Sequence, residues 1–434
     1  MSRPTGFADL AGRRVGLWGY GVEGRAARAR LEGTCELVVV DDRDLGEGVL
    51  VASEGGLEAL ARCEVVLKSP GVPRRRADVL ALEAGGTLVT SALNLWLLGA
   101  DRSRVVAVTG TKGKSTTTAL TAFVLESLGR AALATGNLGR PPYDPALDTE
   151  GRDVVVEVSS FQSVDLEVAP AVVAVTALGS DHLDWHGSLE RYHEDKLAVT
   201  RAPGEHVTLL ADVEALHARR DLAGGAVTWV GPDDSGLAGE LGLVGAHNDQ
   251  NVAIALAAAA ALAGVGVGVA REAARAHAAR FAPLPGRLTM VATERRAGGD
   301  VRFVDDGLAT SPLPTLAALE VFDGEPLALI AGGYDRGVDY DGLAAALAGR
   351  AGPTTVVATG PAGGRIARAL QARGAGGRVV EAATMPEAVA RARAALADGG
   401  GVVLLSPAAP SFDRYRDWAE RSADFTQVVR SLVG

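Results

Sequence analysis

The residue types and spacing with the clearest chemical meaning lie in residues 105–120, VVAVTGTKGKSTTTAL. An apolar, β-rich run leads into two glycines around paired lysines, and hydroxyl side chains then open an Ala/Leu-rich segment. In a strand–loop–helix layout of this kind, backbone N–H groups and the helix N-terminus cradle phosphate oxygens. Lys114 would reach the outer phosphates and Ser115 would hold Mg²⁺. The segment therefore predicts a nucleoside triphosphate site.

This match is to a shorter variant of the phosphate loop. The full pattern has a further glycine five residues before Gly113, where this chain has Val108. The alternative is an ordinary strand-to-helix turn with solvated lysines. The flanking strand and helix favour the phosphate site.

A second glycine loop, Gly19–Gly24 (GYGVEG), follows the apolar run RRVGLW. It fits the dinucleotide fingerprint, and Asp41 and Asp42 lie at about the distance that would meet a ribose. Alone the pattern is weak, because many phosphate-bearing nucleotides use such a turn. A diphosphate ligand such as a UDP-sugar is favoured over NAD. Tight packing without any ligand is the third interpretation.

Further candidates stand where strands of the middle region end. Glu157 closes the strand in VVVEVSSFQ, and strand ends in α/β sheets face the ligand crevice. The run SDHLDWHGSLERYHEDK follows another strand and holds His182, His193 and Lys196. A zinc site is a rival interpretation, but no cysteine lies nearby and His193 falls on a probable helix face, so we favour magnesium.

Polar groups recur at the ends of later strands, in HNDQN (247–251), at Arg287, at Asp305–Asp306 and in GGYDRG (332–337). Each alone is more often turn chemistry or a helix cap. Their recurrence in successive α/β units makes them candidates.

The elements that must position these residues alternate between short β-rich runs and Ala/Leu/Arg-rich helical stretches, which predicts parallel α/β sheets. Three α/β domains are expected: residues 1–97 with a Rossmann-like fold, a central P-loop-type ATPase domain at 98–284, and a Rossmann-like domain at 285–434. FAPLPGRL marks the last boundary. A chain of 434 residues is too long for one ordinary core.

Composition excludes several classes of protein. The net charge of −10 gives no basic field for nucleic acid. Two cysteines make a disulfide framework improbable, and the first residues lack the apolar core of a signal peptide, so the cytoplasm is the expected compartment. Residues 251–270 are uncharged and imitate a membrane span, but Ala and Gly dominate them, and we expect a buried helix with no membrane partner.

Taken in order, these motifs resemble the Mur ligases, ATP-dependent enzymes that add amino acids to the peptidoglycan precursor UDP-N-acetylmuramate. The likeness covers essentially the full length and is strongest to the glutamate-adding branch. The motifs that carry it are GYGVEG and KSPGVP; then TGTKGKSTTT, GNLG, EVSSFQ, DHLDWHG and HN-x-x-N; and finally GR, DD, GG-x-D and LLSPAAPSFD.

The resemblance implies a role for each matching position. UDP-N-acetylmuramoyl-L-alanine, ATP with Mg²⁺, and glutamate would occupy the first, second and third domains, and a monomer is expected. Lys196 matches a lysine that family members carry as a carbamate. The implied residues are, for catalysis, Lys114, Glu157, His182 and Lys196; for ATP, Gly110, Thr111, Lys112, Gly113, Lys114, Ser115, Thr116, Asn137, Asn248, Asn251, Arg287 and Asp306; for the UDP-substrate, Gly19, Gly21, Val22, Glu23, Asp41, Arg43, Ser69, Ser159 and Gln162; for the amino acid, Thr310, Arg336, Ser411 and Trp418; and for the metal, Ser115, Glu157 and His182.

Some positions depart from the D-glutamate-adding pattern. Leu308 and Arg336 stand where lysines are usual, and Trp418 replaces a phenylalanine. Arg for Lys changes donor geometry while keeping the charge. We therefore expect addition of L-glutamate, with D-glutamate as the alternative. An NAD-linked dehydrogenase and a non-catalytic nucleotide-binding regulator are the competing classes.

Overall fold

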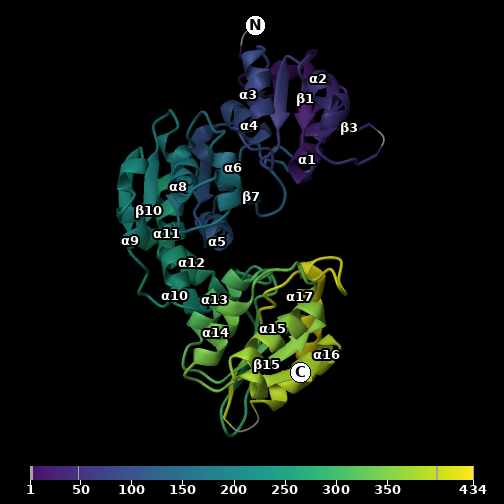
Figure 1. Cartoon of the computed structure of the whole chain (residues 1–434). Helices are drawn as coiled ribbons and strands as arrows, with labels where there is room; N and C mark the ends of the chain where they lie inside the picture. The colour runs from purple at the N-terminus through teal and green to yellow at the C-terminus, as the bar shows by residue number, and fades with distance from the viewer. Residues whose placement is uncertain (1–2, 47, 397–398, 434) are drawn as a thin grey trace. The chain divides into compact units, whose positions relative to one another are not determined.

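The computed structural model describes residues 3–46, 48–396 and 399–433. The chain divides into two compact units, Met1–Leu237 with Asp249–Arg280 and Ala238–Asn248 with Phe281–Gly434. Figure 1 shows the α/β composition of both. The mixed α/β class with parallel sheets confirms the predicted fold class.

The first sheet has five parallel strands in the order β3-β2-β1-β4-β5. Alternate strand residues point to opposite faces of this sheet and pack into two different apolar clusters. Helices therefore cover both faces. Val15, Leu17 and Leu67 face α1 and α4, while Trp18 and Val66 face α2 and α3. The elements are β1 (Arg14–Trp18), α1 (Val22–Leu31), β2 (Glu36–Asp41), β3 (Leu50–Val51), α2 (Leu57–Leu60), β4 (Val65–Lys68), α3 (Ala77–Ala84), β5 (Leu88–Thr90) and α4 (Ala92–Gly99).

The second sheet has six parallel strands in the order β11-β10-β9-β6-β8-β7. Its core is continuous with that of the first sheet, because α4 packs Leu93 and Leu95 into the same cluster as Val105 and Val154. Strands and helices here are β6 (Val105–Thr109), α5 (Lys114–Ser127), β7 (Ala132–Gly136), β8 (Asp153–Glu157), α6 (Ser160–Ser163), β9 (Val172–Val175), α7 (Leu183–His186), α8 (Leu189–Leu197), β10 (Val207–Ala211), α9 (Glu214–His217) and β11 (Ala226–Val230).

The Ala-rich segment forms two helices where the sequence predicted one. After α10 (Leu237–Glu240), α11 (His247–Ala263) ends before Gly264, whose φ of +69° favours glycine, and α12 (Val267–Ala276) follows at an angle of 112°. Val252–Ala260 is largely buried, whereas Val269 on α12 is exposed. Within the described ranges no single helix is long and apolar enough to cross a membrane; only this bent pair passes by length and composition together.

The third sheet has six strands in the order β12-β13-β17-β14-β15-β16. All pairs are parallel except β12 with β13. Helices α13, α14 and α15 pack on one face, and α16 and α17 on the other. The bounds are β12 (Thr289–Glu294), β13 (Val301–Asp305), α13 (Pro312–Val321), β14 (Leu327–Gly332), α14 (Asp341–Gly349), β15 (Thr354–Thr359), α15 (Gly360–Ala372), β16 (Val379–Ala382), α16 (Met385–Ala394), β17 (Gly401–Leu405) and α17 (Trp418–Val433).

Three strands that the sequence reading did not name, β3, β11 and β12, each lie at one edge of a sheet. Their residues are half-buried or exposed, so they lack the continuous apolar run that marks a central parallel strand. The three sheets fall within the three predicted domain ranges, but the boundaries themselves stay a prediction.

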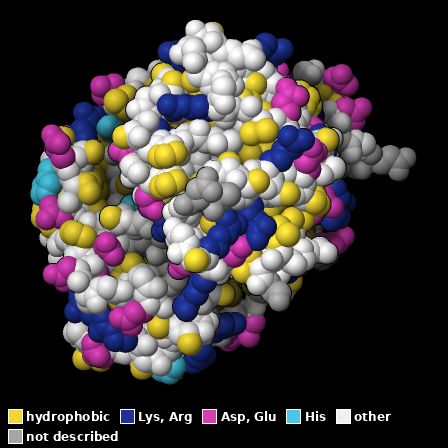
Figure 2. Space-filling view, turned by 90° about the horizontal axis from the view of Figure 1, so that it is seen from below, with side chains coloured by type: hydrophobic (Ala, Val, Ile, Leu, Met, Phe, Trp, Pro, Cys, Tyr) yellow, Lys and Arg dark blue, Asp and Glu magenta, His cyan; other side chains and the backbone are white. Residues whose placement is uncertain are grey.

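On the face in Figure 2, basic side chains lie among acidic and apolar ones.

Candidate active site

The predicted phosphate loop joins the middle of the second sheet to α5. Gly110 and Gly113 have φ values of +140° and +83°, and a Cβ on them would lie 2.2 Å from Thr176 Oγ1 and 2.3 Å from Asn251 Oδ1. Only glycine fits both positions. Gly113, the N-cap residue of α5, makes no side-chain cap hydrogen bond, and the N-terminus of a helix after such a loop favours an anion.

Two lysines converge on one carbonyl of this loop. Lys114 Nζ donates to Gly110 O at 2.9 Å and to Thr111 O at 3.2 Å. Lys196, on α8 and nearly buried, also donates to Gly110 O at 2.9 Å. Burial, and then the positive charge of Lys114, hold the pKa of Lys196 well below its usual value.

The alternative to a carbamate is an unmodified Lys196 in a helical salt bridge. The described residues show no such salt bridge for Lys196. Its ammonium contacts the Gly110 carbonyl and lies 4.9 Å from the centroid of the Tyr192 ring. A lowered pKa favours the neutral amine, which is the form that reacts with CO₂. The carbamate itself stays a prediction.

Glu157 ends β8, beside the phosphate strand β6, and is 2% exposed. Its Oε1 accepts a hydrogen bond from Asn137 Nδ2 at 2.9 Å, while its Oε2 is buried and has no partner among the described residues. An unpaired buried carboxylate oxygen fits a cation. Ser115, at the start of α5, is also buried.

His182 lies on the segment before α7 with φ 48° and ψ 39°, a left-handed conformation that is uncommon outside glycine. Its ring is 4.9 Å from that of Phe161, and its side chain is half exposed. The described residues hold no group of three or more His, Cys, Asp or Glu that could bind a metal. Mg²⁺, which keeps waters and substrate oxygens as ligands, fits Glu157 better than a zinc cage does.

The glycine turn of the first sheet, residues 19–24, is tightly packed and is bonded to a side chain from the loop after β4. A Cβ on Gly24 would lie 2.0 Å from Gly19 O, and Ser69 Oγ donates to that same oxygen at 2.6 Å. Asp41 accepts from the N–H groups of Tyr20 and Arg43. Burial raises the pKa of Asp41, but these hydrogen bonds outweigh it and leave the pKa below its usual value. Gly21, Val22 and Arg43 are exposed.

Glu23 reaches from α1 to the second sheet's elements. Tyr143 Oη donates to its Oε2 at 3.0 Å, and Gln162 Nε2 donates to its Oε1. Burial raises the pKa of Glu23 to about 6, although both hydrogen bonds oppose the shift. Ser159 and Gln162 form a capping box on α6. Three predicted UDP-substrate residues, Glu23, Ser159 and Gln162, are therefore also structural partners.

The predicted nucleotide residues are divided between the two units. Asn251 lies against the phosphate loop, and its Oδ1 accepts from Thr117 Oγ1 at 3.3 Å. Asn248 belongs to the second unit, where Nδ2 donates to Val244 O. Asp306, after β13, accepts from Ser406 Oγ at 2.7 Å. Burial, only partly offset by Ser406, raises its pKa to about 7. Arg287 is exposed just before β12.

The predicted amino-acid residues surround the strand ends of the third sheet. The Arg336 guanidinium lies 5.7 Å from the Phe412 ring centroid, next to the buried Ser411. The Trp418 ring packs on Gly286, where a Cβ would lie 2.7 Å from it. Thr310 donates its backbone N–H to Leu308 O. These contacts form two local groups, Arg336 with Phe412 and Trp418 with Gly286.

Sequence reasoning missed Arg421, which is 4% exposed. Its guanidinium donates to the carbonyls of Gly307, Gly332 and Ala409, and so joins the end of β14 to the segments that follow β13 and β17. The signal was its position on the buried face of α17, with Ser422, Phe425 and Val429.

Comparison with known proteins gives a consistent result. Residues 108–228 match the Mur ligase middle domain, and residues 286–409 match the Mur ligase glutamate ligase domain. UDP-N-acetylmuramoyl-L-alanine–L-glutamate ligase of a Micromonospora species is 39% identical, over 99% of both chains. The protein of the same name from Xanthomonas axonopodis pv. citri is 36% identical, over 98% of this chain and 96% of its own. A crystal structure of MurF from Acinetobacter baumannii superposes with a TM-score of 0.57 at 18% identity, over 97% of this chain and 93% of that one.

Proposed function

The chain belongs to the Mur ligase family, whose members are ATP-dependent, ADP-forming peptide ligases, and we propose that it joins L-glutamate to UDP-N-acetylmuramoyl-L-alanine. The observation that carries the proposal is the match over nearly the whole chain to relatives named as L-glutamate ligases. The reaction is a step of peptidoglycan precursor synthesis. We further propose that the protein acts as a cytoplasmic monomer.

The reaction needs activation because a carboxylate resists attack by an amine. A carboxylate oxygen of the L-alanyl end attacks the γ-phosphorus of ATP, and the bond to the β–γ bridging oxygen breaks, which gives an acyl phosphate and ADP. The glutamate nitrogen then attacks the acyl carbon, phosphate leaves, and the amine loses a proton. Each step is favoured by alignment and by compensation of charge.

Several of the chain's own groups would supply that compensation. Lys114 and the N-terminus of α5 would bind the phosphates, and Lys196 would stand beside them at the shared Gly110 carbonyl. Glu157, Ser115 and His182 would hold Mg²⁺. That ion would neutralise phosphate oxygens as the carboxylate approaches.

Two residues of the second unit support the proposed preference for L-glutamate, in addition to the names of the relatives. Arg336 and Trp418 depart from the D-glutamate-adding pattern, and the structure places them beside Phe412 and against Gly286. A guanidinium offers a planar fork to a carboxylate where lysine offers a single point charge. These residues would thereby set how the two carboxylates and the amine of glutamate are held.

The test is ADP release from ATP and Mg²⁺ with UDP-N-acetylmuramoyl-L-alanine and either enantiomer of glutamate. We expect release with L-glutamate and little with D-glutamate. The reverse preference would establish the D-glutamate alternative, and no release with either would refute the ligase assignment for this chain.

Lys114→Ala separates the ligase from the other two classes of protein. We expect ADP formation to fall at least ~100-fold, because the phosphates lose a cation in a site where charge compensation dominates. A dehydrogenase would bind NAD(H) and would not need Lys114, and a non-catalytic regulator would show no turnover to lose.

A further inference from the structure

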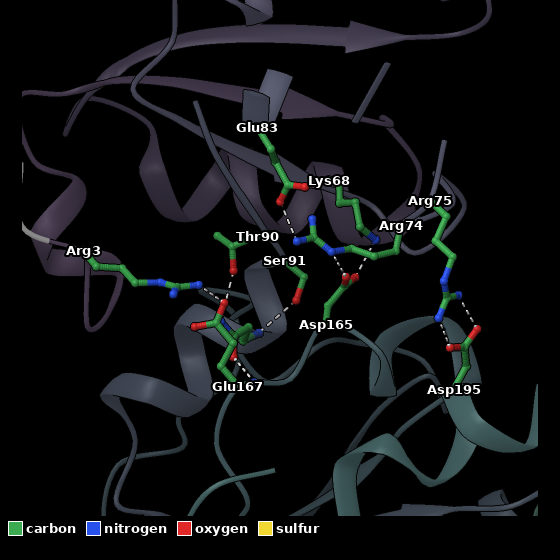
Figure 3. A network of polar contacts seen from close by, with 11 residues as sticks. Arg3, Lys68, Arg74, Arg75, Glu83, Thr90, Ser91, Asp165, Glu167 and Asp195 are labelled. Carbon is green, nitrogen blue, oxygen red and sulfur yellow. Dashed lines mark hydrogen bonds and ion pairs between the residues drawn. The ribbon is translucent and has the colours of Figure 1, made fainter. Parts of the chain in front are cut away.

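Three consecutive arginines, Arg74 to Arg76, follow the KSPGVP loop after β4 and resemble a basic patch for phosphates. In the structure each has a different acidic partner. Arg74 pairs with Glu83 and also lies 3.9 Å from the buried Asp165, and Arg76 pairs with Asp42 and Asp78. Except for Asp165, these partners belong to the first sheet's segment of the chain. Arg75 reaches elsewhere, to Asp195 on α8 of the second sheet (Figure 3).

The Arg75–Asp195 contact is bidentate. Nη1 lies 2.9 Å from Oδ2 and Nη2 lies 2.7 Å from Oδ1, and the Asp195 side chain is only 2% exposed. Asp195 Oδ2 is also 2.8 Å from Nδ1 of the buried His186, whose Nε2 is 2.9 Å from Ser160 Oγ. Arg75 therefore supplies a positive charge next to Asp195. A bidentate pair between a guanidinium and a carboxylate fixes their orientation as well as their distance.

The next residue of α8 after Asp195 is Lys196, which holds the phosphate loop at Gly110 O. One turn earlier, Tyr192 Oη lies 2.9 Å from Thr111 Oγ1 in the same loop. Helix α8 is therefore bonded both to the phosphate loop and to Arg75. A shift of this short, rigid element would move both sets of contacts together.

The three arginines belong to the loop of residues 69–76, which follows β4. The start of this loop is bonded to the glycine turn of the first sheet. Ser69 donates to Gly19 O, and the neighbouring Lys68 forms a buried ion pair with Asp165, 2.5 Å apart. Lys68 and Arg74 thus hold the loop against Asp165, whereas Arg75 joins it to Asp195 on α8.

We propose that Arg75 is a positioning residue that acts through Asp195 on α8. It couples the loop of residues 69–76, which contains the predicted UDP-substrate residue Ser69, to the phosphate loop of the second sheet. The inference rests on the proposed function in one respect, because it takes these loops as the sites of UDP-N-acetylmuramoyl-L-alanine and ATP. Arg75 touches neither the phosphate loop nor the glycine turn in the contacts described above. Its effect is on how strongly one ligand favours the other.

The test is a binding cycle that requires no turnover. The dissociation constant of a non-hydrolysable ATP analogue with Mg²⁺ is measured with and without saturating UDP-N-acetylmuramoyl-L-alanine, and the converse is measured as well. Linkage requires both ratios to be equal. We expect each ligand to tighten the other about 10-fold in the unaltered protein, a value within the usual range for coupled sites. In Arg75→Ala the factor should fall below about 2, with each single-ligand constant within about 3-fold of its original value.

Two variants sharpen the comparison. Arg3→Ala removes another ion pair between the first and second sheets' elements, Arg3 with Glu167, which does not involve α8 (Figure 3). It should keep the coupling. Arg75→Lys retains the charge without the fork and should give an intermediate factor. It also serves as the test variant if Arg75→Ala fails to fold in a thermal melt.

The outcomes are distinct. Unchanged coupling in the Arg75 variants, equal loss of coupling in Arg3→Ala, or no coupling in the unaltered protein would each overturn the positioning role. A purely structural role would lower the melting temperature and the active fraction without changing the ratio of constants. Coupling without glutamate-dependent ADP release would refute the proposed function alone, and release with unchanged coupling would refute the role of Arg75 alone.

Discussion

At the scale of single residues, Glu157 combines burial with an unsatisfied oxygen. Asn137 satisfies Oε1, and Oε2 has no partner in the described part of the chain. A buried acceptor without a partner is costly, so such an atom in a folded protein is suited to bind a cation. The position at the end of β8, beside the phosphate strand, supports the proposal that Glu157 is a ligand of Mg²⁺.

Glu157→Gln should therefore separate stability from metal use. The amide keeps the size and removes the charge, so we expect the melting temperature to stay equal or rise, because a charge that lacks full compensation is removed from the interior. The Mg²⁺ concentration for half-maximal ADP release should rise about 10-fold or more as a carboxylate ligand is lost. Titration of Mg²⁺ with both proteins checks this, and an unchanged requirement would contradict the assigned ligand.

Asp306 offers a second residue-scale test, through pH. Burial raises its pKa to about 7 from a usual value of 3.8. Between these values the folded state retains a proton that the unfolded chain releases, so the free energy of unfolding falls as pH rises across that window. Asp306→Asn removes this loss. We expect it to be more stable by up to about 4 kcal/mol at pH 8 and no different near pH 4, since the shift spans about three pKa units and one unit corresponds to about 1.4 kcal/mol.

Urea denaturation at both pH values measures that difference. Identical pH dependence in the two proteins would contradict the raised pKa. If Asp306 also contacts the nucleotide, the stabilised variant should lose activity at every pH.

Local structure was most readable where the residues are contiguous along the chain. The strand–loop–helix layout around Lys114 and Ser115 is confirmed, because its strand, glycines and helix stand in one run. The partners of Asp41, Ser159 and Gln162 were not readable, since a side chain that caps its own turn has the same letters as one that faces a ligand. Arg75 and Asp195 are 120 positions apart, and no local pattern links them.

At the scale of elements, the buried central strands were readable, whereas three edge strands, β3, β11 and β12, were not. Strands such as β6 and β14 are buried at every position, so they appear as unbroken apolar runs. Strand β12 is half-buried and antiparallel to β13, with a register irregularity between Met290 and Ala292. An edge strand of this kind is fixed by contacts from outside itself.

Glu294 makes one such contact, and this contact predicts that the free energy of unfolding depends on pH. It ends β12 and accepts from Arg393 on α16 and from Arg296, hydrogen bonds that lower its pKa to about 2 from 4.5. The unfolded chain binds a proton on Glu294 first as pH falls, so this stabilisation is present above about pH 4.5 and is lost toward pH 2. Glu294→Gln should cost about 1 kcal/mol at pH 7, less than the full shift implies, because water screens the partly exposed arginines.

Denaturation midpoints at pH 7 and at successively lower pH measure the effect. The difference from the unaltered protein should shrink as pH drops below about 4.5. Glu381→Gln, an exposed glutamate on β16 at the opposite edge of the same sheet, is the matched control and should change little. A constant difference at all pH values would exclude the two ion pairs as its cause.

At the scale of the whole molecule, the predicted ATP residues belong to both compact units. Lys114, Asn137 and Asn251 lie in the first unit, and Asn248, Arg287 and Asp306 lie in the second. A ligand that binds only the folded state stabilises whatever it contacts, by about 2.7 kcal/mol at 100 times its dissociation constant. The thermal response of each unit therefore reports whether the nucleotide contacts it.

Scanning calorimetry of the full chain with and without a non-hydrolysable ATP analogue and Mg²⁺ makes this measurable. Two compact units predict two unfolding transitions without ligand, because cooperativity follows the contacts within each unit. If Asn248, Arg287 and Asp306 bind the nucleotide, the ligand should raise both transitions or merge them. Arg287→Ala should then leave the first unit's shift in place and reduce the second unit's, because the first unit's phosphate contacts do not depend on Arg287. A ligand that shifts only one transition in the unaltered protein would confine ATP to the phosphate loop and remove the second-unit residues from the site.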